Sequence, residues 1–357
     1  MTNVERLQQR ISEDGAEAYL LSDMANVGWA TSFTGSFGFL LVTSEAARFL
    51  TDSRYTLQAQ EQLGAIPSFS FANPKKVEEF IADHAREMGL RTISFEASSV
   101  PYATYEKWRG ALEGIELVPG KDVVGELRMV KSADELARIR EACKLADACF
   151  EHVRRLVRPG ISEYDLGLEI EFYFRRSGAG LAFEPIVVSG NRSARPHGRP
   201  SEKLLERGDF VTFDFGAQLN GMCSDLTRTI VVGEASDRHR EVYQRVLDAQ
   251  LASLEMMRPG VPAKDVDAKA RDAMGDMAQY FGHGLGHGLG GVVHDNGRMG
   301  PSNTDILAEG QVWTVEPGIY IEGFGGVRIE DDVVVTSTGI EMLTSSPKEM
   351  LVLPEAK

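Results

Sequence analysis

The chain has 357 residues, of which 43% are hydrophobic and 25% charged, and it carries a net charge of -15. A chain of this length usually divides into two domains, and its composition is that of a globular protein rather than a disordered or fibrous one. The negative charge would repel phosphate groups, and no basic stripe offsets it, so we expect no nucleic-acid partner.

The sequence also indicates a compartment. The first residues show no basic segment followed by an apolar run, and no stretch reaches the apolar length of a membrane span. The 3 cysteines lack the spacing of a metal finger, which predicts reduced and mostly buried thiols without a chemical role. We therefore expect a cytoplasmic protein without a membrane partner.

Residues 1–125 alternate short helical and strand-like patterns, which predicts an α/β domain. Amphipathic helices are expected at residues 4–13 and 77–88. Apolar runs predict strands at residues 18–21, 38–42, 47–51 and 92–95. A second domain is expected to follow, from residue 126 to residue 357.

The second domain is expected to begin with a long helix. Ser132 and Glu135 form a capping-box pattern, and apolar residues recur at helical spacing over residues 136–157. Another helix is expected over residues 162–177. The Arg-Pro-Gly phrase that ends the long helix recurs 100 residues later in a similar context. The recurrence either marks two related halves of one domain or reflects how commonly Pro-Gly ends a helix.

A pair of aspartates lies on a predicted β-hairpin. The segments that flank the Asn-Gly turn at residues 220–221 alternate as strands do, and this dipeptide is the strongest two-residue hairpin signal. With that turn, Asp214 faces Thr227 and lies diagonal to Asp225 on one face, roughly 7–8 Å away at the backbone. Two such carboxylates can hold a cation between them, although two surface aspartates on a hairpin are also common.

Residues 281–291 carry glycine at nearly every other position. This argues against a helix and favours extended backbone that passes close to a ligand or another strand. His283 and His287 then lie on one side of the segment, and His294 follows. A single histidine is more often structural, but three of the chain's 7 histidines lie within residues 283–294, and this clustering favours a site.

Two further carboxylates lie in strand-like motifs near the end of the chain. Residues 313–318 and 326–331 are predicted as strands joined through a glycine-rich turn, with Glu316 at the end of the first and Glu330 within the second. Arg328 shares a face with Glu330. An ordinary Arg–Glu surface pair has the same pattern, but Glu330 has apolar neighbours, among which an unpaired carboxylate would be costly.

Four carboxylates that converge would repel one another, whereas two divalent ions would balance their negative charges. The predicted ligands are these four carboxylates, Asp214, Asp225, Glu316 and Glu330, together with one histidine of the glycine-rich segment. Because oxygen donors dominate this set, it predicts two divalent ions, with manganese as the first choice and cobalt or zinc as alternatives.

At these residues the sequence resembles the pita-bread metallopeptidase family, which includes methionine aminopeptidase, aminopeptidase P and prolidase. The matching motifs, in the family's order, are the hairpin from Asp214 to Asp225 and residues 286–288, 316–318 and 327–331. The resemblance covers the chain from about residue 130 onwards. It implies an α/β N-terminal domain followed by an α+β pita-bread (creatinase/aminopeptidase) catalytic domain with pseudo-twofold halves, and a homodimer.

The resemblance also implies a role for each predicted ligand. Asp214 would chelate one metal, Asp225 and Glu330 would bridge the two metals, and His287 and Glu316 would complete the second site. A bridging water would be the nucleophile. Glu316 would also act as a proton shuttle.

Other residues match positions around the metals. His197 and His294 resemble the family's two non-ligand active-site histidines, which would donate hydrogen bonds to the substrate. His283 resembles an outer histidine. Arg328 would orient Glu330 from behind.

The first domain separates members of this family, because methionine aminopeptidases generally lack a preceding domain of this size. Residues 33–36 and 51–55 look like the aminopeptidase P version. The resemblance therefore implies hydrolysis of the bond between an N-terminal residue and proline in short peptides. Residues 290–291 are both glycine where a bulkier apolar residue often follows the first, and we expect this to widen the pocket.

Three other functions share this architecture. An Xaa-Pro dipeptidase, or prolidase, needs a cation that pairs with the dipeptide's carboxylate, and the candidates are Arg54, Arg192, Arg195 and Arg199. A metal-free creatinase-like hydrolase and a non-catalytic peptide-binding module would both lack metal ligands, whereas the predicted set is intact here. We therefore predict an Xaa-Pro aminopeptidase, with the dipeptidase as its nearest rival.

Overall fold

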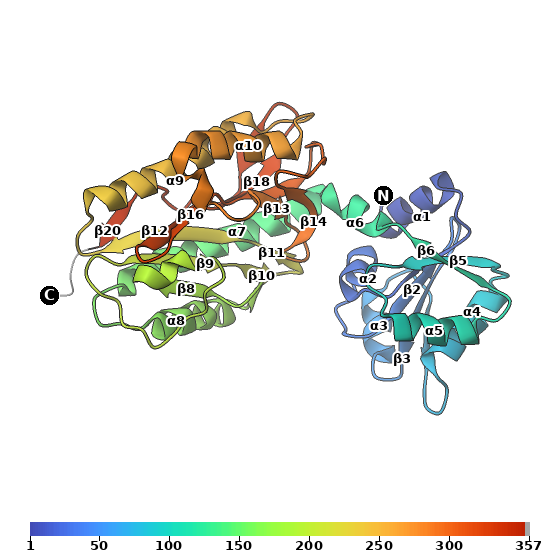
Figure 1. The fold of residues 1–357 in the computed structure, drawn as a ribbon. Helices are drawn as coiled ribbons and strands as arrows, with labels where there is room; N and C mark the ends of the chain where they lie inside the picture. The colour runs from blue at the N-terminus through green and yellow to red at the C-terminus, as the bar shows by residue number, and fades with distance from the viewer. Residues whose placement is uncertain (354–357) are drawn as a thin grey trace. The chain divides into compact units, whose positions relative to one another are not determined.

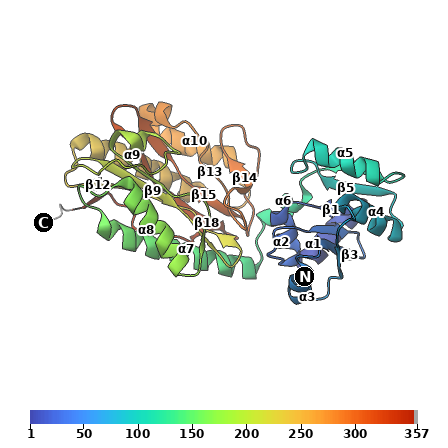
Figure 2. The same ribbon diagram turned by 90° about the horizontal axis from the view of Figure 1, so that it is seen from below.

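The computed structural model describes residues 1–353 and divides the chain into two compact units, Met1–Arg128 and Met129–Lys357. The division expected after residue 125 falls inside helix α6 (Val123–Met129), which ends where the second unit begins. Figures 1 and 2 show the elements of each unit. Within the described residues, no helix is both long enough and apolar enough to cross a membrane.

The first unit is built on a six-stranded sheet with the order β4-β3-β2-β1-β5-β6. The strands are β1 (Tyr19–Leu21), β2 (Phe39–Val42), β3 (Ala47–Asp52), β4 (Ser68–Phe71), β5 (Thr92–Glu96) and β6 (Glu116–Gly120). The helices, besides α6, are α1 (Asn3–Glu13), α2 (Met24–Thr31), α3 (Thr56–Gln62), α4 (Val77–Glu87) and α5 (Tyr102–Ala111). The predicted α/β character and the predicted strands and helices are confirmed, while α2, α3, α5, α6, β4 and β6 are additional.

Successive side chains of β1 and β2 point to opposite faces of this sheet and fill two separate cores. Leu21 and Leu40 pack with α1, α2, α3 and α6, whereas Leu20 and Leu41 pack with α4 and α5. Helices therefore cover both faces of the sheet, as Figure 2 shows.

The second unit contains four long helices and many short strands. The helices are α7 (Ala133–Val153), α8 (Glu163–Arg176), α9 (Asp237–Met256) and α10 (Ala263–Met274), with short 3-10 turns η1 (Arg154–Leu156), η2 (Gly190–Ala194) and η3 (Gly275–Tyr280). The strands of its first half are β7 (Gly180–Leu181), β8 (Ile186–Ser189), β9 (Phe210–Phe215), β10 (Ala217–Leu219), β11 (Met222–Cys223) and β12 (Leu226–Val232). Those that follow are β13 (Gly286–Gly288), β14 (Asp295–Met299), β15 (Val312–Val315), β16 (Gly318–Ile321), β17 (Gly325–Arg328), β18 (Asp331–Val335), β19 (Ile340–Met342) and β20 (Leu351–Leu353).

Each half of this unit packs two helices against one side of a sheet. Helices α7 and α8 share a core with β8, β9 and β12, which lie in the sheet β20-β12-β9-β8. Helices α9 and α10 share a core with β15 and β18, which lie in the sheet β14-β13-β15-β18-β19. In Figure 2 the strands lie between the two helix pairs, so each sheet turns one face away from its own helices.

The recurring Arg-Pro-Gly phrase has the same local structure in both halves. Gly160 and Gly260 have φ angles of 88° and 86°, a region that favours glycine. The N–H of Gly160 donates to the carbonyl of Leu205 (2.9 Å), and the N–H of Gly260 donates to the carbonyl of Leu307 (2.8 Å). This shared geometry supports the interpretation as two related halves.

Candidate metal centre

The predicted hairpin and its register are confirmed. Asp214 pairs with Thr227 across β9 and β12, as the turn requires. Asn220 and Gly221 have φ angles of 51° and 76°, and this left-handed pair is what a tight two-residue hairpin needs. Asp214 and Asp225 are 8% and 5% exposed, whereas the opposite face of β9 fills the core under α7 and α8. The two carboxylates therefore belong to a buried site rather than to a solvated hairpin.

The glycine-rich segment is extended, as predicted, and forms β13. A Cβ at Gly286 would lie 2.0 Å from the carbonyl oxygen of Thr314, and a Cβ at Gly288 would lie 1.8 Å from that of Asn296. Only glycine allows neighbouring backbone to approach β13 this closely. His287 stands between these glycines, so its position is fixed by backbone on both sides.

The ring of His287 is oriented for coordination. Its Nδ1 lies 3.0 Å from the carbonyl oxygen of Gly288, while its Nε2 faces Asp225 (3.7 Å) and Glu316 (3.6 Å). If the proton is on Nδ1, this N–H donates to the Gly288 carbonyl, and the lone pair of Nε2 points toward the carboxylates. Burial lowers the pKa of His287 to about 4, which keeps the ring neutral, as a metal ligand must be.

Glu316 and Glu330 lie at breaks between strands. The prediction of Glu330 within a continuous strand is wrong, because it falls between β17 and β18. Its N–H donates to the carbonyl of Thr227 (3.1 Å), so the chain leaves the β16–β17 hairpin and contacts β12. Glu316 lies between β15 and β16, next to Pro317, which has no N–H for a sheet. These breaks bring both glutamates to the two aspartates.

All of the predicted site residues line one cavity of about 740 Å³. They are His197, Asp214, Asp225, His287, His294, Glu316, Arg328 and Glu330. Donor atoms of Asp225, His287 and Glu330 lie within 4.8 Å of one another, close enough to bind one ion. Oδ1 of Asp214 and of Asp225 are buried and have no hydrogen-bond partner among the described residues. Orphaned carboxylate oxygens in a group of oxygen and imidazole donors fit divalent cations.

Burial and mutual repulsion make these acids hard to ionise without a cation. Burial, followed by the charge of Glu330, raises the pKa of Asp225 and of Glu316 well above the usual range. Burial, followed by the charge of Asp214, raises the pKa of Glu330 to about 8. Cations that displace these protons would remove the repulsion, so metal binding should be coupled to proton release.

Arg328 acts on two of the acids. Its Nη2 donates directly to Asp214, and its Nε donates to the hydroxyl of Thr227 (3.1 Å). That hydroxyl donates to the Glu330 carboxylate (2.6 Å). Arg328 therefore reaches Glu330, its predicted target, only through Thr227 and contacts Asp214 itself. Arg328 also contacts Tyr320, which the sequence did not indicate as part of the site. The Tyr320 hydroxyl accepts from Arg328 Nη1 (2.8 Å).

The remaining histidines lie around the acids at different depths. The rings of His294 and His287 meet edge to face with centroids 4.5 Å apart. His197 and His294 are exposed at the cavity wall. His283 is deeper, with Nε2 2.9 Å from the Tyr320 hydroxyl, which agrees with its predicted outer position.

The expectation that residues 290–291 widen the pocket is wrong. A Cβ at Gly290 would meet Asp295 Oδ2 at 2.2 Å, and neither Gly290 nor Gly291 is among the residues that line the cavity. Gly290 therefore makes room for the buried Lys131–Asp295 pair (3.3 Å), and neither glycine widens the pocket.

Of the arginines proposed to hold a substrate carboxylate, Arg199 lines the cavity, while Arg192 is paired with Glu163 (3.0 Å). Arg195 is not among the lining residues, and Arg54 belongs to the first unit, where it pairs with Asp52 (2.7 Å).

Sequence reasoning missed a third arginine of the cavity, Arg298, which lines it together with Arg199 and Arg328. It pairs with His287 across β13 and β14, so its side chain shares a face with this predicted ligand. Its Nη1 donates to the carbonyls of Asp295 (2.6 Å) and Gly297 (2.8 Å), which fixes one edge of the guanidinium. Nε and Nη2 have no hydrogen-bond partner among residues 1–353, so they are available to an anion in the cavity.

Each of the two units matches the model of a known protein family. The model of "Metallopeptidase family M24" matches residues 137–337, and that of "Creatinase/Prolidase N-terminal domain" matches residues 3–130. The chain is 42% identical to an uncharacterized peptidase, YqhT, of Bacillus subtilis (strain 168), over 98% of this chain and 99% of that one.

Two solved structures extend the comparison. A structure titled Xaa-Pro dipeptidase from Bacillus anthracis has a TM-score of 0.95 and 41% identity, covering 98% of this chain and 99% of that one. One titled X-Pro aminopeptidase from Thermotoga maritima MSB8 has a TM-score of 0.89 and 34% identity, covering 96% and 100%. With the donor set in the cavity, these matches make the protein a metallopeptidase. It belongs to metallopeptidase family M24, and the predicted pita-bread fold is confirmed.

Proposed function

We propose that this metallopeptidase hydrolyses the bond between an N-terminal residue and proline, with two divalent ions held by five ligands. The proposed ligands are Asp214, Asp225, His287, Glu316 and Glu330. The observation that carries the proposal is the convergence of Asp225, His287 and Glu330 donors within 4.8 Å, beside two orphaned carboxylate oxygens. Manganese is the proposed metal, with cobalt or zinc as alternatives. A cytoplasmic location and a homodimer stay predictions from the sequence.

The chain's own residues would bind, orient and protonate the substrate. When bound, two ions supply an activated water and polarise the scissile carbonyl. Glu316 would carry the proton from that water toward the leaving proline nitrogen. His294 and His197, at the cavity wall, would donate hydrogen bonds to the carbonyl oxygen and to the region of the leaving group. Arg328 would keep Asp214 in position for its metal.

The finer question is whether the substrate is a dipeptide that ends at proline or a longer peptide. The sequence favoured an aminopeptidase, and the similarity to the Thermotoga maritima X-Pro aminopeptidase keeps that candidate. A guanidinium with two available nitrogens in the cavity instead favours an Xaa-Pro dipeptidase. Arg298 could pair with the carboxylate of a dipeptide, whereas the neutral amide of a longer peptide would leave that charge uncompensated. We therefore propose the dipeptidase, with Arg298 as the carboxylate partner.

A comparison of the dipeptide Met-Pro with its C-terminal amide tests this choice. We expect the wild-type enzyme to prefer the free carboxylate, and Arg298→Met to lower kcat/KM for the dipeptide about 10- to 100-fold, since a hydrogen bond to a charged group contributes about 1.5–3 kcal/mol. The amide should be cleaved equally by both forms. Arg199→Met is the matched control, because it removes another guanidinium from the cavity wall. Equal cleavage of dipeptide and amide by the wild type would favour the aminopeptidase.

A further inference from the structure

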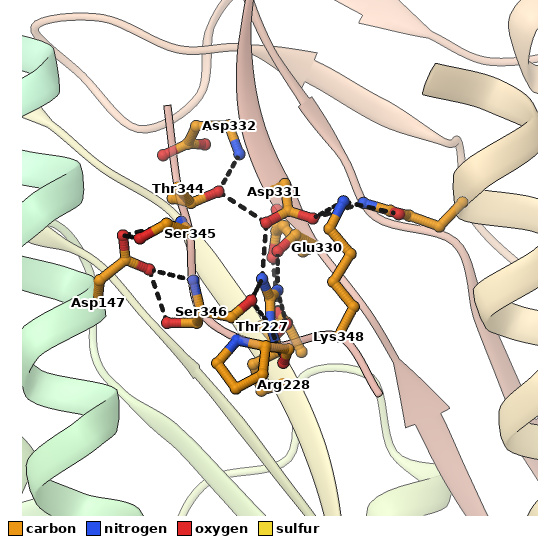
Figure 3. Close-up of polar contacts among 12 residues, drawn as sticks. Asp147, Thr227, Arg228, Glu330, Asp331, Asp332, Thr344, Ser345, Ser346 and Lys348 are labelled. Atoms are coloured by element: carbon orange, nitrogen blue, oxygen red, sulfur yellow. Dashed lines mark hydrogen bonds and ion pairs between the residues drawn. The ribbon is translucent and has the colours of Figure 1, made fainter. Parts of the chain in front are cut away.

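A second buried polar cluster lies next to Glu330, and Figure 3 shows its contacts. We call it the Arg228 network, and its members are Arg228, Gln250, Asp331, Thr344, Ser346 and Lys348. None of these is among the described residues that line the cavity, so the network lies outside the proposed substrate site. It is nonetheless joined to the proposed metal ligand.

Arg228 is 1% exposed and holds the backbone on which Glu330 stands. Its Nη1 donates to the carbonyls of Glu330 and of Thr227 (2.8 Å for the latter). Thr227 is the residue whose hydroxyl donates to the Glu330 carboxylate (2.6 Å). One guanidinium therefore fixes both the main chain of this ligand and the group that orients its side chain.

Asp331, the neighbour of Glu330, is fully buried and fixes the other end of Arg228. Its Oδ1 accepts from Arg228 Nη2 and from the Thr344 hydroxyl, both at 2.7 Å. Its Oδ2 accepts from Gln250 (2.6 Å) and Lys348 (2.8 Å). Two cations thus surround one carboxylate, and the cluster keeps a net positive charge beside the carboxylates of the cavity.

The chain segment 344–348, which we call the C-terminal strap, supplies the remaining acceptors. Arg228 Nη2 donates to the carbonyl of Ser346 (2.7 Å), and its Nε donates to that of Pro347 (3.0 Å). The strap is fastened to α7, because both oxygens of Asp147 accept from the N–H and hydroxyl groups of Ser345 and Ser346 at 2.6–2.8 Å. Figure 3 shows Asp147 reaching the strap from this helix.

The geometry points to Arg228 as a positioning residue of the metal centre, held in place by the C-terminal strap. It keeps Glu330 at the strand break where the carboxylate meets Asp225 and His287. This inference rests on the proposed role of Glu330 as a ligand. Lysine would keep the charge but could not donate in a planar fork to the Glu330, Thr227 and strap carbonyls together.

Calorimetric titration of metal-free protein with Mn²⁺ tests the role of Arg228. We expect Arg228→Lys to bind Mn²⁺ about 10- to 100-fold more weakly, the usual effect of losing a group that orients a ligand. Asp147→Asn, which loosens the strap without touching Arg228, should weaken binding in the same direction by a smaller factor, because it acts on Glu330 only through the strap and Arg228. Ile170→Val is the matched control, because it disturbs only the core under α7 and α8 and should leave affinity unchanged.

The outcomes separate this inference from the proposed function. If the wild type itself takes up no Mn²⁺, the metal assignment fails. If the wild type binds and both Arg228→Lys and Asp147→Asn bind equally well, the inference fails. Should Arg228→Lys not fold, Asp147→Asn decides: weaker binding at unchanged thermal stability supports the role of the strap, and unchanged affinity overturns it.

Discussion

Asp225→Asn is expected to lower kcat by about 10³-fold or more, because a metal centre supplies several kcal/mol of transition-state stabilisation. Asparagine keeps the shape of this side chain but loses its charge and directs an NH₂ group into the site. Oδ1 of Asp225 is buried without a hydrogen-bond partner among the described residues, and Oδ2 lies 3.7 Å from His287 Nε2. Turnover at saturating Mn²⁺, measured beside the wild type, gives the effect.

The control for Asp225→Asn is the stability of the metal-free protein. Burial, followed by the charge of Glu330, raises the pKa of Asp225, so the wild-type carboxyl is unfavourable in its charged form. The amide removes that charge, and the melting temperature of the metal-free variant should not fall below that of the wild type. Lost activity with retained stability assigns Asp225 to the chemistry. Turnover close to wild type would contradict its proposed role as a metal ligand.

His294→Ala is expected to lower kcat about 10²-fold while metal content stays the same, since a positioned proton donor typically contributes 10²–10⁴-fold. The His294 ring meets His287 edge to face at 4.5 Å but lies outside the Asp225, His287 and Glu330 group. Partial burial at the cavity wall lowers the pKa of His294, so the neutral ring donates through one nitrogen. Kinetics and metal analysis on the same preparation give both readouts.

His287→Ala is the matched comparison for His294→Ala. The two rings touch, so both variants open similar space in the cavity wall. Removal of His287 should release metal, whereas removal of His294 should not. If His294→Ala leaves turnover unchanged, this histidine has a structural role only.

Much of the candidate metal centre could be predicted because its signals are local. The Asn-Gly turn sets the register that puts Asp214 opposite Thr227. Glycine on both sides of His287 indicated extended backbone pressed between strands, and the structure has the neighbouring carbonyl oxygens where a Cβ would lie. The turn residues and the glycines therefore predicted the hairpin register and the extended backbone around His287.

The parts that could not be predicted depend on pairing between distant segments. Arg298 reaches the cavity because β14 pairs with β13, with a register shift after His287 that no local pattern indicates. Arg228 meets its partners about a hundred residues away, at Asp331 and the C-terminal strap. Helix α2 was missed because its buried residues do not form a regular apolar stripe.

The most direct test of the account is to count the metal ions in active protein. The wild-type chain, purified with Mn²⁺ and freed of excess metal by gel filtration, should hold two ions per chain by elemental mass spectrometry. Chelation should abolish hydrolysis of Met-Pro, and activity should return as Mn²⁺ is added back toward that ratio. Full activity in protein stripped of all metal would contradict the proposed mechanism.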